Sequence, residues 1–104
     1  SKRSWKMAML HLVNKSPFDA CSLNTAASIM KGGDELLLIE DGVYGAMKNS
    51  KGAALLDGLK VSVLGPDLAA RGIPEDRLAD GVTVIDYAGF VDLVEANEKV
   101  QSWL

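Results

Sequence analysis

The stretch LHLVNKSPFDACSL at residues 10–23 holds the only histidine of the chain, His11, and its only cysteine, Cys21. A thiol near the start of a helix can act as a nucleophile, because the free N–H groups of the first turn stabilise the thiolate. Lys15 is close enough in sequence to add positive charge, whereas Asp19 opposes it. Cysteine is also among the residues most often buried, and on an amphipathic helix it usually belongs to the core. We therefore favour a packing role for Cys21 over a reactive thiol.

Two interpretations are open for His11. It lies between Leu10 and Leu12 in an apolar run, where it could donate a proton or form a hydrogen bond at the edge of the sheet or at an interface. We favour a buried strand histidine with a local partner, because no second histidine or cysteine stands beside it as a metal ligand. The phosphate-binding patterns GxxxxGK(S/T) and GxGxxG are absent too. We expect neither a bound metal nor a cofactor.

Short apolar runs alternate with helical patterns along the chain. Strands are predicted at residues 8–13, 35–40, 60–64 and 82–86, and helices at 19–31, at 42–57 with a break near Asn49 and Ser50, at 67–72 and at 88–97. Nearly continuous apolar strands are typical of a parallel sheet that is covered on both faces. The predicted fold class is therefore α/β, a small three-layer α/β/α sandwich with a mainly parallel sheet, of the Rossmann or flavodoxin-like type.

Polar and turn-forming residues follow each predicted strand, at the edge of the sheet where open α/β folds bind ligands. They are Asn14-Lys15-Ser16-Pro17, Asp41-Gly42, Gly65-Pro66-Asp67 and Asp86-Tyr87. Lys15 could bind an anion together with the following helix N-terminus. We favour the simpler interpretation that Ser16 or Asp19 caps that helix. Asp41 and Asp67 are likewise predicted to cap the helices that follow them.

Three aromatic residues could take part in subunit contacts. Tyr44 is either an interface residue or a half-buried residue beside an acidic loop, and both interpretations stay open. Tyr87 could face the edge of the sheet or a neighbouring subunit, although we favour packing within the domain. Trp103, next to the last residue given, would be costly if left exposed. We expect it to fold back on the sheet edge or to anchor a partner.

The composition fits one small domain with an aliphatic core, because 48% of the 104 residues are hydrophobic and only 6% are aromatic. Residues 7–104 are expected to form this domain, and residues 1–6 an added or unstructured extension. The first six residues hold three of the 11 basic residues, so the body is acidic and we expect no direct binding of nucleic acid. Without a long apolar run or a charged leader, no membrane association is expected. A lone reduced thiol fits a cytoplasmic protein.

Four separated motifs carry a resemblance to a known family. They are VNKSPF at 13–18, LLLIEDGVYGA at 36–46, VLGPDLAARGI at 63–73, and DYAGFVDL at 86–93 followed by QSWL at 101–104. In this order and spacing they resemble the DsrH/TusB family, the smallest subunit of the DsrEFH and TusBCD sulfur-relay complexes. The sequences VLGPD and DYAGFVDL resemble the DsrH branch of sulfur oxidisers more closely than the TusB branch that serves tRNA 2-thiouridine synthesis.

The resemblance implies a subunit of a hetero-oligomeric sulfurtransferase complex that passes persulfide sulfur between carrier proteins, in dissimilatory sulfur oxidation. The implied partners are a DsrE/TusD-like subunit, a DsrF/TusC-like subunit and, as a further candidate, a TusE/DsrC-like sulfur carrier. In this family the main transfer cysteine belongs to the DsrE/TusD partner. The cysteine that some DsrH members carry in the first helix falls on Ala26 here, five residues after Cys21. Cys21 therefore inherits no role by position and is at most an accessory sulfur acceptor.

Three other functions remain as alternatives. The first is a TusB-like subunit in the relay for tRNA thiolation, and the second is a stand-alone homo-oligomeric binding protein of the same fold. The third is an independent enzyme that uses Cys21 as its nucleophile. This third function is disfavoured, because no second histidine, oxyanion-type glycine motif or cofactor pattern accompanies the thiol.

Overall fold

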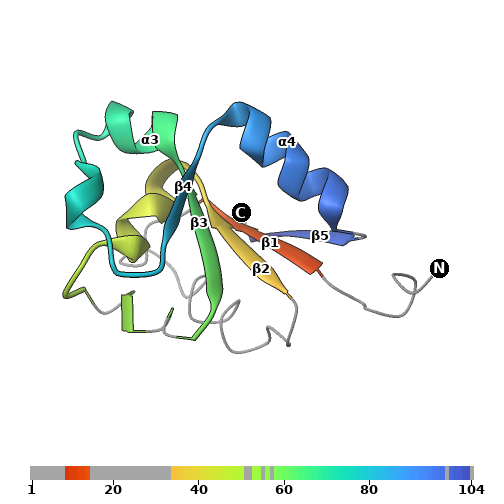
Figure 1. Cartoon of the computed structure of the whole chain (residues 1–104), viewed down its shortest axis with the longest axis horizontal. Coiled ribbons are helices and arrows are strands. Elements are labelled where there is room, and N and C mark those ends of the chain that lie inside the picture. Colours follow the sequence, from red (N-terminus) through yellow and green to blue (C-terminus); the bar gives the residue numbers. More distant parts are fainter. Residues whose placement is uncertain are drawn as a thin grey trace.

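The computed structural model describes residues 9–14, 34–50, 53–54, 56, 58–97 and 99–103. In this part of the chain, five strands form one sheet in the order β4-β3-β2-β1-β5 (Figure 1). The strands are β1 (Met9–Val13), β2 (Glu35–Leu38), β3 (Lys60–Leu64), β4 (Thr83–Ile85) and β5 (Lys99–Trp103). All of the pairings between these neighbours are parallel. The prediction of an α/β fold with a mainly parallel sheet is confirmed.

Helical segments connect the strands and cover the sheet. They include the 3-10 helix η2 (Glu40–Ala46), the α-helix α3 (Gly65–Ala70), the 3-10 helix η3 (Glu75–Arg77) and the α-helix α4 (Tyr87–Ala96). α3 follows β3 without a loop, and Pro66 lies in its first turn. The proline nitrogen has no hydrogen to donate, and in a first turn none is needed within the helix.

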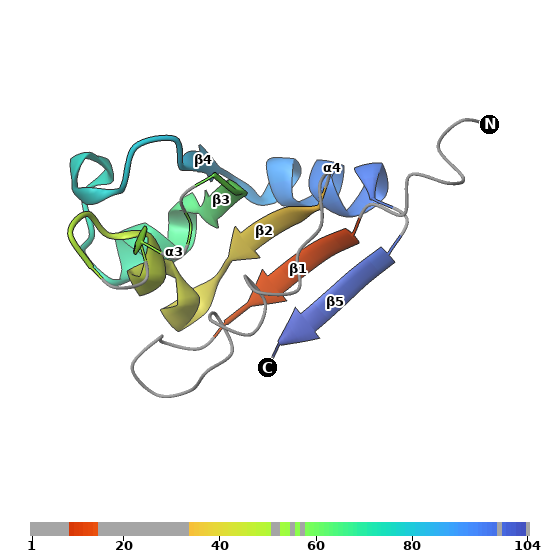
Figure 2. The same cartoon turned by 90° about the horizontal axis from the view of Figure 1, so that it is seen from below.

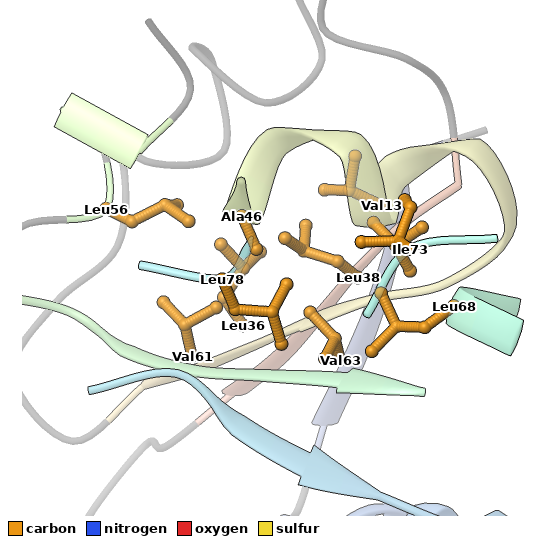
Figure 3. Packing of buried hydrophobic residues seen from close by; sticks show 11 residues of the cluster. Val13, Leu36, Leu38, Ala46, Leu56, Val61, Val63, Leu68, Ile73 and Leu78 are labelled. Carbon is orange, nitrogen blue, oxygen red and sulfur yellow. The ribbon is translucent and has the colours of Figure 1, made fainter. Parts of the chain in front are cut away.

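A hydrophobic cluster of buried residues lies on one face of the sheet (Figure 3). Alternate strand positions point to this face, and they are Val13, Leu36, Leu38, Val61 and Val63. Aliphatic residues of the covering segments complete the cluster, and they are Val43, Ala46, Leu56, Leu68, Ile73 and Leu78. Because burial of each methylene contributes roughly 0.8 kcal/mol, this cluster is a major source of stability.

α4 covers the opposite face of the sheet (Figures 1 and 2). Val84 packs against the hydrophobic cluster, so the next residue, Ile85, points to the other face. Gly89 of α4 lies directly against Ile85, since a Cβ at Gly89 would be 2.9 Å from the Ile85 Cβ. Leu37 is also fully buried on this second face. The sheet therefore forms the middle of three layers, as predicted.

Gly42 allows η2 to run against the end of β1. A Cβ at Gly42 would overlap the carbonyl oxygen of Val13. The backbone at this point is also bonded, because Ile39 N–H donates to the Val13 oxygen at 3.0 Å and Gly42 N–H donates to the Ile39 oxygen at 2.8 Å. The glycine of the Asp41-Gly42 pair is thus required by this close approach of two backbones.

Two predicted helices differ from the structure. The first part of the helix predicted at 42–57 is a 3-10 helix that begins at Glu40 and ends at Ala46. The predicted break near Asn49 and Ser50 is confirmed, because Asn49 has a φ of 61°. The helix predicted at 67–72 is shifted and begins at Gly65. The prediction at 19–31 lies outside the described residues.

β5 was missed because its sequence, KVQSW, has no apolar run. The pattern that marks a parallel strand is a series of buried residues on both faces. The side chains of Lys99, Val100, Gln101 and Ser102 are all exposed instead. β5 pairs with β1 in register from Met9 opposite Lys99 to Val13 opposite Trp103.

Candidate functional site

Polar residues follow the ends of strands β1 to β4. We call this group the carboxyl edge, and it consists of Asn14, Glu40, Asp41, Asp67, Arg71 and Asp86. The sequence predicted that these strand ends lie on one edge of the sheet, and the contacts between elements bear this out for the first three strands. The side-chain amide of Asn14, just after β1, donates to Glu40 Oε1 at 3.0 Å.

Glu40 is the centre of the carboxyl edge. Its φ of 50° lies in the left-handed region, which is uncommon for a residue with a side chain. This conformation accompanies a backbone hydrogen bond across the edge, in which Glu40 N–H donates to Asp67 Oδ2 at 2.6 Å. Glu40 is thus bonded to the end of β1 through its carboxylate and to the first turn of α3 through its backbone.

Arg71 joins α3 to η2. Its Nε donates to Asp41 Oδ1 at 2.9 Å, and its Nη1 donates to the Asp67 carbonyl oxygen at 3.3 Å. The Asp41 side chain is 57% exposed and that of Arg71 is 22% exposed. Because solvent screens such a pair, its contribution to stability is at most about 1 kcal/mol. The pair connects α3 with η2 but adds little to the free energy of unfolding.

Asp86 starts α4 and lines a shallow hollow beside it. Its Oδ1 accepts a hydrogen bond from Gly89 N–H at 2.8 Å, which makes Asp86 the N-cap. The hollow, of about 440 Å³, is lined by Gly65, Pro66, Val84, Ile85, Asp86 and Gly89. Asp86 is the one charged residue of this lining, and one of its oxygens is already used for capping. The hollow therefore lacks a pair of groups for general acid and base chemistry.

A second polar group is buried between β1 and β2. His11 Nε2 lies 3.1 Å from Asp34 Oδ2, and Met9 N–H donates to Asp34 Oδ1 at 3.0 Å. The His11 side chain is 2% exposed and that of Asp34 is 5% exposed. One carboxylate thus contacts two residues of β1 just before β2 begins. Sequence analysis named His11 but missed Asp34, although a buried histidine needs a polar partner and Asp34 directly precedes an apolar strand.

Two capping predictions are wrong. Asp41 does not cap a helix, because η2 begins one residue earlier with Ile39 as its N-cap, and the Asp41 carboxylate contacts Arg71. Asp67 does not cap α3, whose N-cap is Leu64 and has no side-chain hydrogen bond. With α3 starting at Gly65, Asp67 is already inside its first turn and reaches Glu40 instead.

The remaining candidate residues are spread over the molecule. Tyr44 is partly buried in η2 and packs against the hydrophobic cluster. Tyr87 is exposed at the start of α4, and the Trp103 backbone lies opposite Val13 at the end of β5. Lys15, Ser16, Asp19 and Cys21 lie outside the described residues.

Every charged side chain of the carboxyl edge has a hydrogen-bond partner among the described residues. Its carboxylates accept hydrogen bonds from backbone N–H groups, from Arg71 or from the Asn14 amide, and no described residue there is a thiol. Within the same residues no group of three or more His, Cys, Asp or Glu side chains could hold a metal ion. No helix in this part of the chain is long and apolar enough to cross a membrane.

Comparison with known sequences gives a consistent result. A family model described as "DsrH like protein" matches residues 15–100. Protein TusB of Photorhabdus laumondii subsp. laumondii is 35% identical over 97 residues, covering 91% of this chain and 100% of that protein. Protein TusB of Yersinia pestis (strain Pestoides F) is 34% identical with the same coverage.

Solved structures show the same fold. The crystal structure of the ychN protein from E. coli superposes with a TM-score of 0.75 at 18% identity, covering 92% of this chain and 98% of that one. The solution structure of protein Tm0979 from Thermotoga maritima gives a TM-score of 0.67 at 30% identity, covering 86% and 94%. The arrangement of the sheet and its covering layers is therefore common to these chains.

Proposed function

Since this chain belongs to the DsrH/TusB family, we propose that it is a non-catalytic or accessory subunit of a hetero-oligomeric complex that relays persulfide sulfur. The observation that carries the proposal is the family match over residues 15–100, together with full-length coverage of relatives named TusB. The described carboxyl edge supports the same role, because its charged groups hold η2 and α3 in place and present a fixed polar surface.

The proposed partners are a DsrE/TusD-like subunit, which supplies the main transfer cysteine, and a DsrF/TusC-like subunit. A TusE/DsrC-like carrier would receive the sulfur, and the assembly would work in the cytoplasm. Asp41 and Tyr44 belong to η2, beside the carboxyl edge, and are candidate contact residues for these partners. Residues 7–104 would form the domain that enters the complex.

For the pathway we propose dissimilatory sulfur oxidation. This proposal is supported by the sequences VLGPD at 63–67 and DYAGFVDL at 86–93, which resemble those of the DsrH branch. Sulfur relay for tRNA 2-thiouridine synthesis is the second candidate, because the relatives at 34% and 35% identity are named TusB. Deleting the gene separates the two: the first predicts impaired oxidation of stored sulfur with normal tRNA, and the second predicts loss of 2-thiouridine.

Cys21 is proposed only as an accessory sulfur acceptor. Incubation of the purified chain with a persulfide donor, followed by intact-mass measurement, tests this role. A gain of one sulfur atom that disappears in Cys21→Ala would support it. No gain on a thiol that still reacts with an alkylating reagent would exclude it.

Co-expression tests the assembly itself. The chain carries an affinity tag and is produced with the two subunits of similar size expected to be encoded beside it, and the captured material is measured by native mass spectrometry. An assembly that contains all three chains is expected. A homo-oligomer or monomer that leaves both partners behind would contradict the proposal, and an unrelated α/β protein of similar size serves as the control for non-specific capture.

A further inference from the structure

Large apolar side chains are exposed on two C-terminal elements. Among the described residues they are Tyr87, Val91 and Val94 on α4 and Val100 on β5, with exposed fractions of 59%, 53%, 37% and 42%. Single exposed apolar residues are common on any protein, but a set gathered on adjoining elements marks an interaction surface. We call these four residues the α4–β5 surface.

α4 packs on the sheet with one side only. Phe90 and Leu93 are partly buried on that side, and none of the helix residues is fully buried. Tyr87, Val91 and Val94 follow the spacing of i, i+4 and i+7, which places them in one stripe along the helix. These three side chains therefore form a continuous apolar stripe beside the side of the helix that packs on the sheet.

β5 adds to the same face of the sheet. Its register places Val100 opposite Leu10. Leu10 does not belong to the hydrophobic cluster on the η2 side, whereas Val13, an odd number of residues away, does. Strand alternation therefore directs Leu10 and Val100 to the face that α4 covers. Figure 2 shows β5 at the border of the sheet with α4 behind the strands.

β5 is also unusual as a parallel strand. Parallel strands are normally buried on both faces, yet four consecutive side chains, from Lys99 to Ser102, are exposed. Because strand side chains alternate between the two faces of the sheet, β5 has exposed side chains on both faces. The α4–β5 surface thus combines a strand whose side chains are exposed with an exposed apolar stripe on the helix.

The charges on α4 indicate the kind of partner. Asp92 and Glu95 are exposed beside the stripe, and the helix contains no lysine or arginine. A second copy packed helix against helix would bring these carboxylates together, which is unfavourable. A partner with basic residues next to an apolar strip would complement both features.

We propose that the α4–β5 surface is the docking surface for one partner subunit of the relay complex, which contacts it through an apolar strip flanked by lysine or arginine side chains. This inference rests on the proposed function and adds to it the surface that is used and the chemistry of the partner's surface. The stripe supplies the buried centre of the interface, and Asp92 and Glu95 form its charged rim.

Substitutions on α4 test the docking surface in the co-expressed complex. Val91→Asp places a charge in the stripe at a position that is already half exposed, so the fold is expected to survive. Binding to the partners should weaken by more than roughly tenfold. The double substitution Asp92→Lys and Glu95→Lys should weaken binding several-fold, and more at low salt than at high salt. Arg77→Asp, at an exposed position of η3 that belongs to neither the carboxyl edge nor the α4–β5 surface, is the control and should change binding by less than about twofold.

The outcomes separate this inference from the proposed function. If the wild-type chain assembles with its partners and Val91→Asp assembles equally well, the partners do not dock on the α4–β5 surface. The proposed relay function is not affected by that result. If the wild-type chain does not assemble, the proposed function fails and this inference fails with it. A homodimer of the wild-type chain that Val91→Asp abolishes would identify a second copy as the occupant and overturn the proposal. Far-UV circular dichroism verifies the fold of each variant.

Discussion

Single side chains fix the relative positions of the strands in this molecule. The Asp34 carboxylate contacts both Met9 N–H and the His11 ring, so it holds the start of β2 at one place along β1. Register matters here because a slip of one residue would turn the buried leucines of β2 to the wrong face. The pair of His11 and Asp34 is therefore primarily structural.

Asp34→Ala is expected to lower the free energy of unfolding by about 2 kcal/mol, since the buried His11 ring and the partly buried Met9 N–H lose this acceptor. Asp34→Asn is the matched control and should cost less, because one oxygen remains to accept from Met9 N–H. Urea unfolding followed by circular dichroism measures both. Equal stabilities of the two variants would contradict the importance of this acceptor.

Two carboxylates of the carboxyl edge, Asp67 and Asp41, are expected to differ in what they contribute to stability. Asp67→Ala should cost about 1 kcal/mol, because Glu40 N–H loses its partner at a residue held in the left-handed region. Asp41→Ala should lower the free energy of unfolding by at most about 0.5 kcal/mol, because the Asp41 side chain is 57% exposed and solvent screens its pair with Arg71. The same urea experiment ranks them, and a larger loss for Asp41→Ala would show that the Arg71 contact is the main connection.

The sequence allowed His11 and Asp41 to be selected, but it did not reveal the partner of either one. His11 bonds a residue 23 positions away and Asp41 one that is 30 positions away. Such pairs depend on strand order and on where each helix begins. The shift of α3 to Gly65 moved Asp67 out of the capping position and into contact with Glu40. Predicting this contact requires the register of three elements at once.

At the scale of elements, the stability of α4 depends on the residues at its N-terminus. The Asp86 side chain accepts a hydrogen bond from Gly89 N–H at the N-terminus of α4, and no α4 residue is fully buried. Loss of the cap is therefore not compensated by deep packing.

Asp86→Ala should reduce the free energy of unfolding by about 1 kcal/mol. Asp86→Asn keeps an oxygen in the same place and should stay within a few tenths of a kcal/mol of the wild type. Hydrogen exchange of the α4 amides gives a local measurement beside urea unfolding. Unchanged exchange in Asp86→Ala would contradict this account of the helix start.

Elements with a strong apolar pattern were predictable, and elements without one were not. Residues 35–38 and 60–64 are nearly continuous apolar runs because both faces of their strands are covered. β5 lacks that pattern because its side chains are exposed. η2 was predicted as an α-helix, since the spacing of its apolar residues does not separate a 3-10 helix from an α-helix over two turns.

At the scale of the whole molecule, one chain has two different surfaces. The carboxyl edge is polar and held by hydrogen bonds, whereas the α4–β5 surface is apolar with acidic residues beside it. Two such surfaces suit a subunit that contacts more than one neighbour. The family resemblance supplied the relay function, which the composition and the spacing of residues alone did not indicate.

The most direct test of the relay account is sulfur transfer in the reconstituted complex. The two partner subunits are loaded with a persulfide donor, and delivery to a TusE/DsrC-like carrier is followed by intact mass with the wild-type chain, with Cys21→Ala, or without this chain. The account predicts delivery with both versions of the chain and only background delivery without it. Equal delivery in the absence of the chain would contradict its role as a relay subunit, and loss of delivery in Cys21→Ala would show that the transfer thiol is its own.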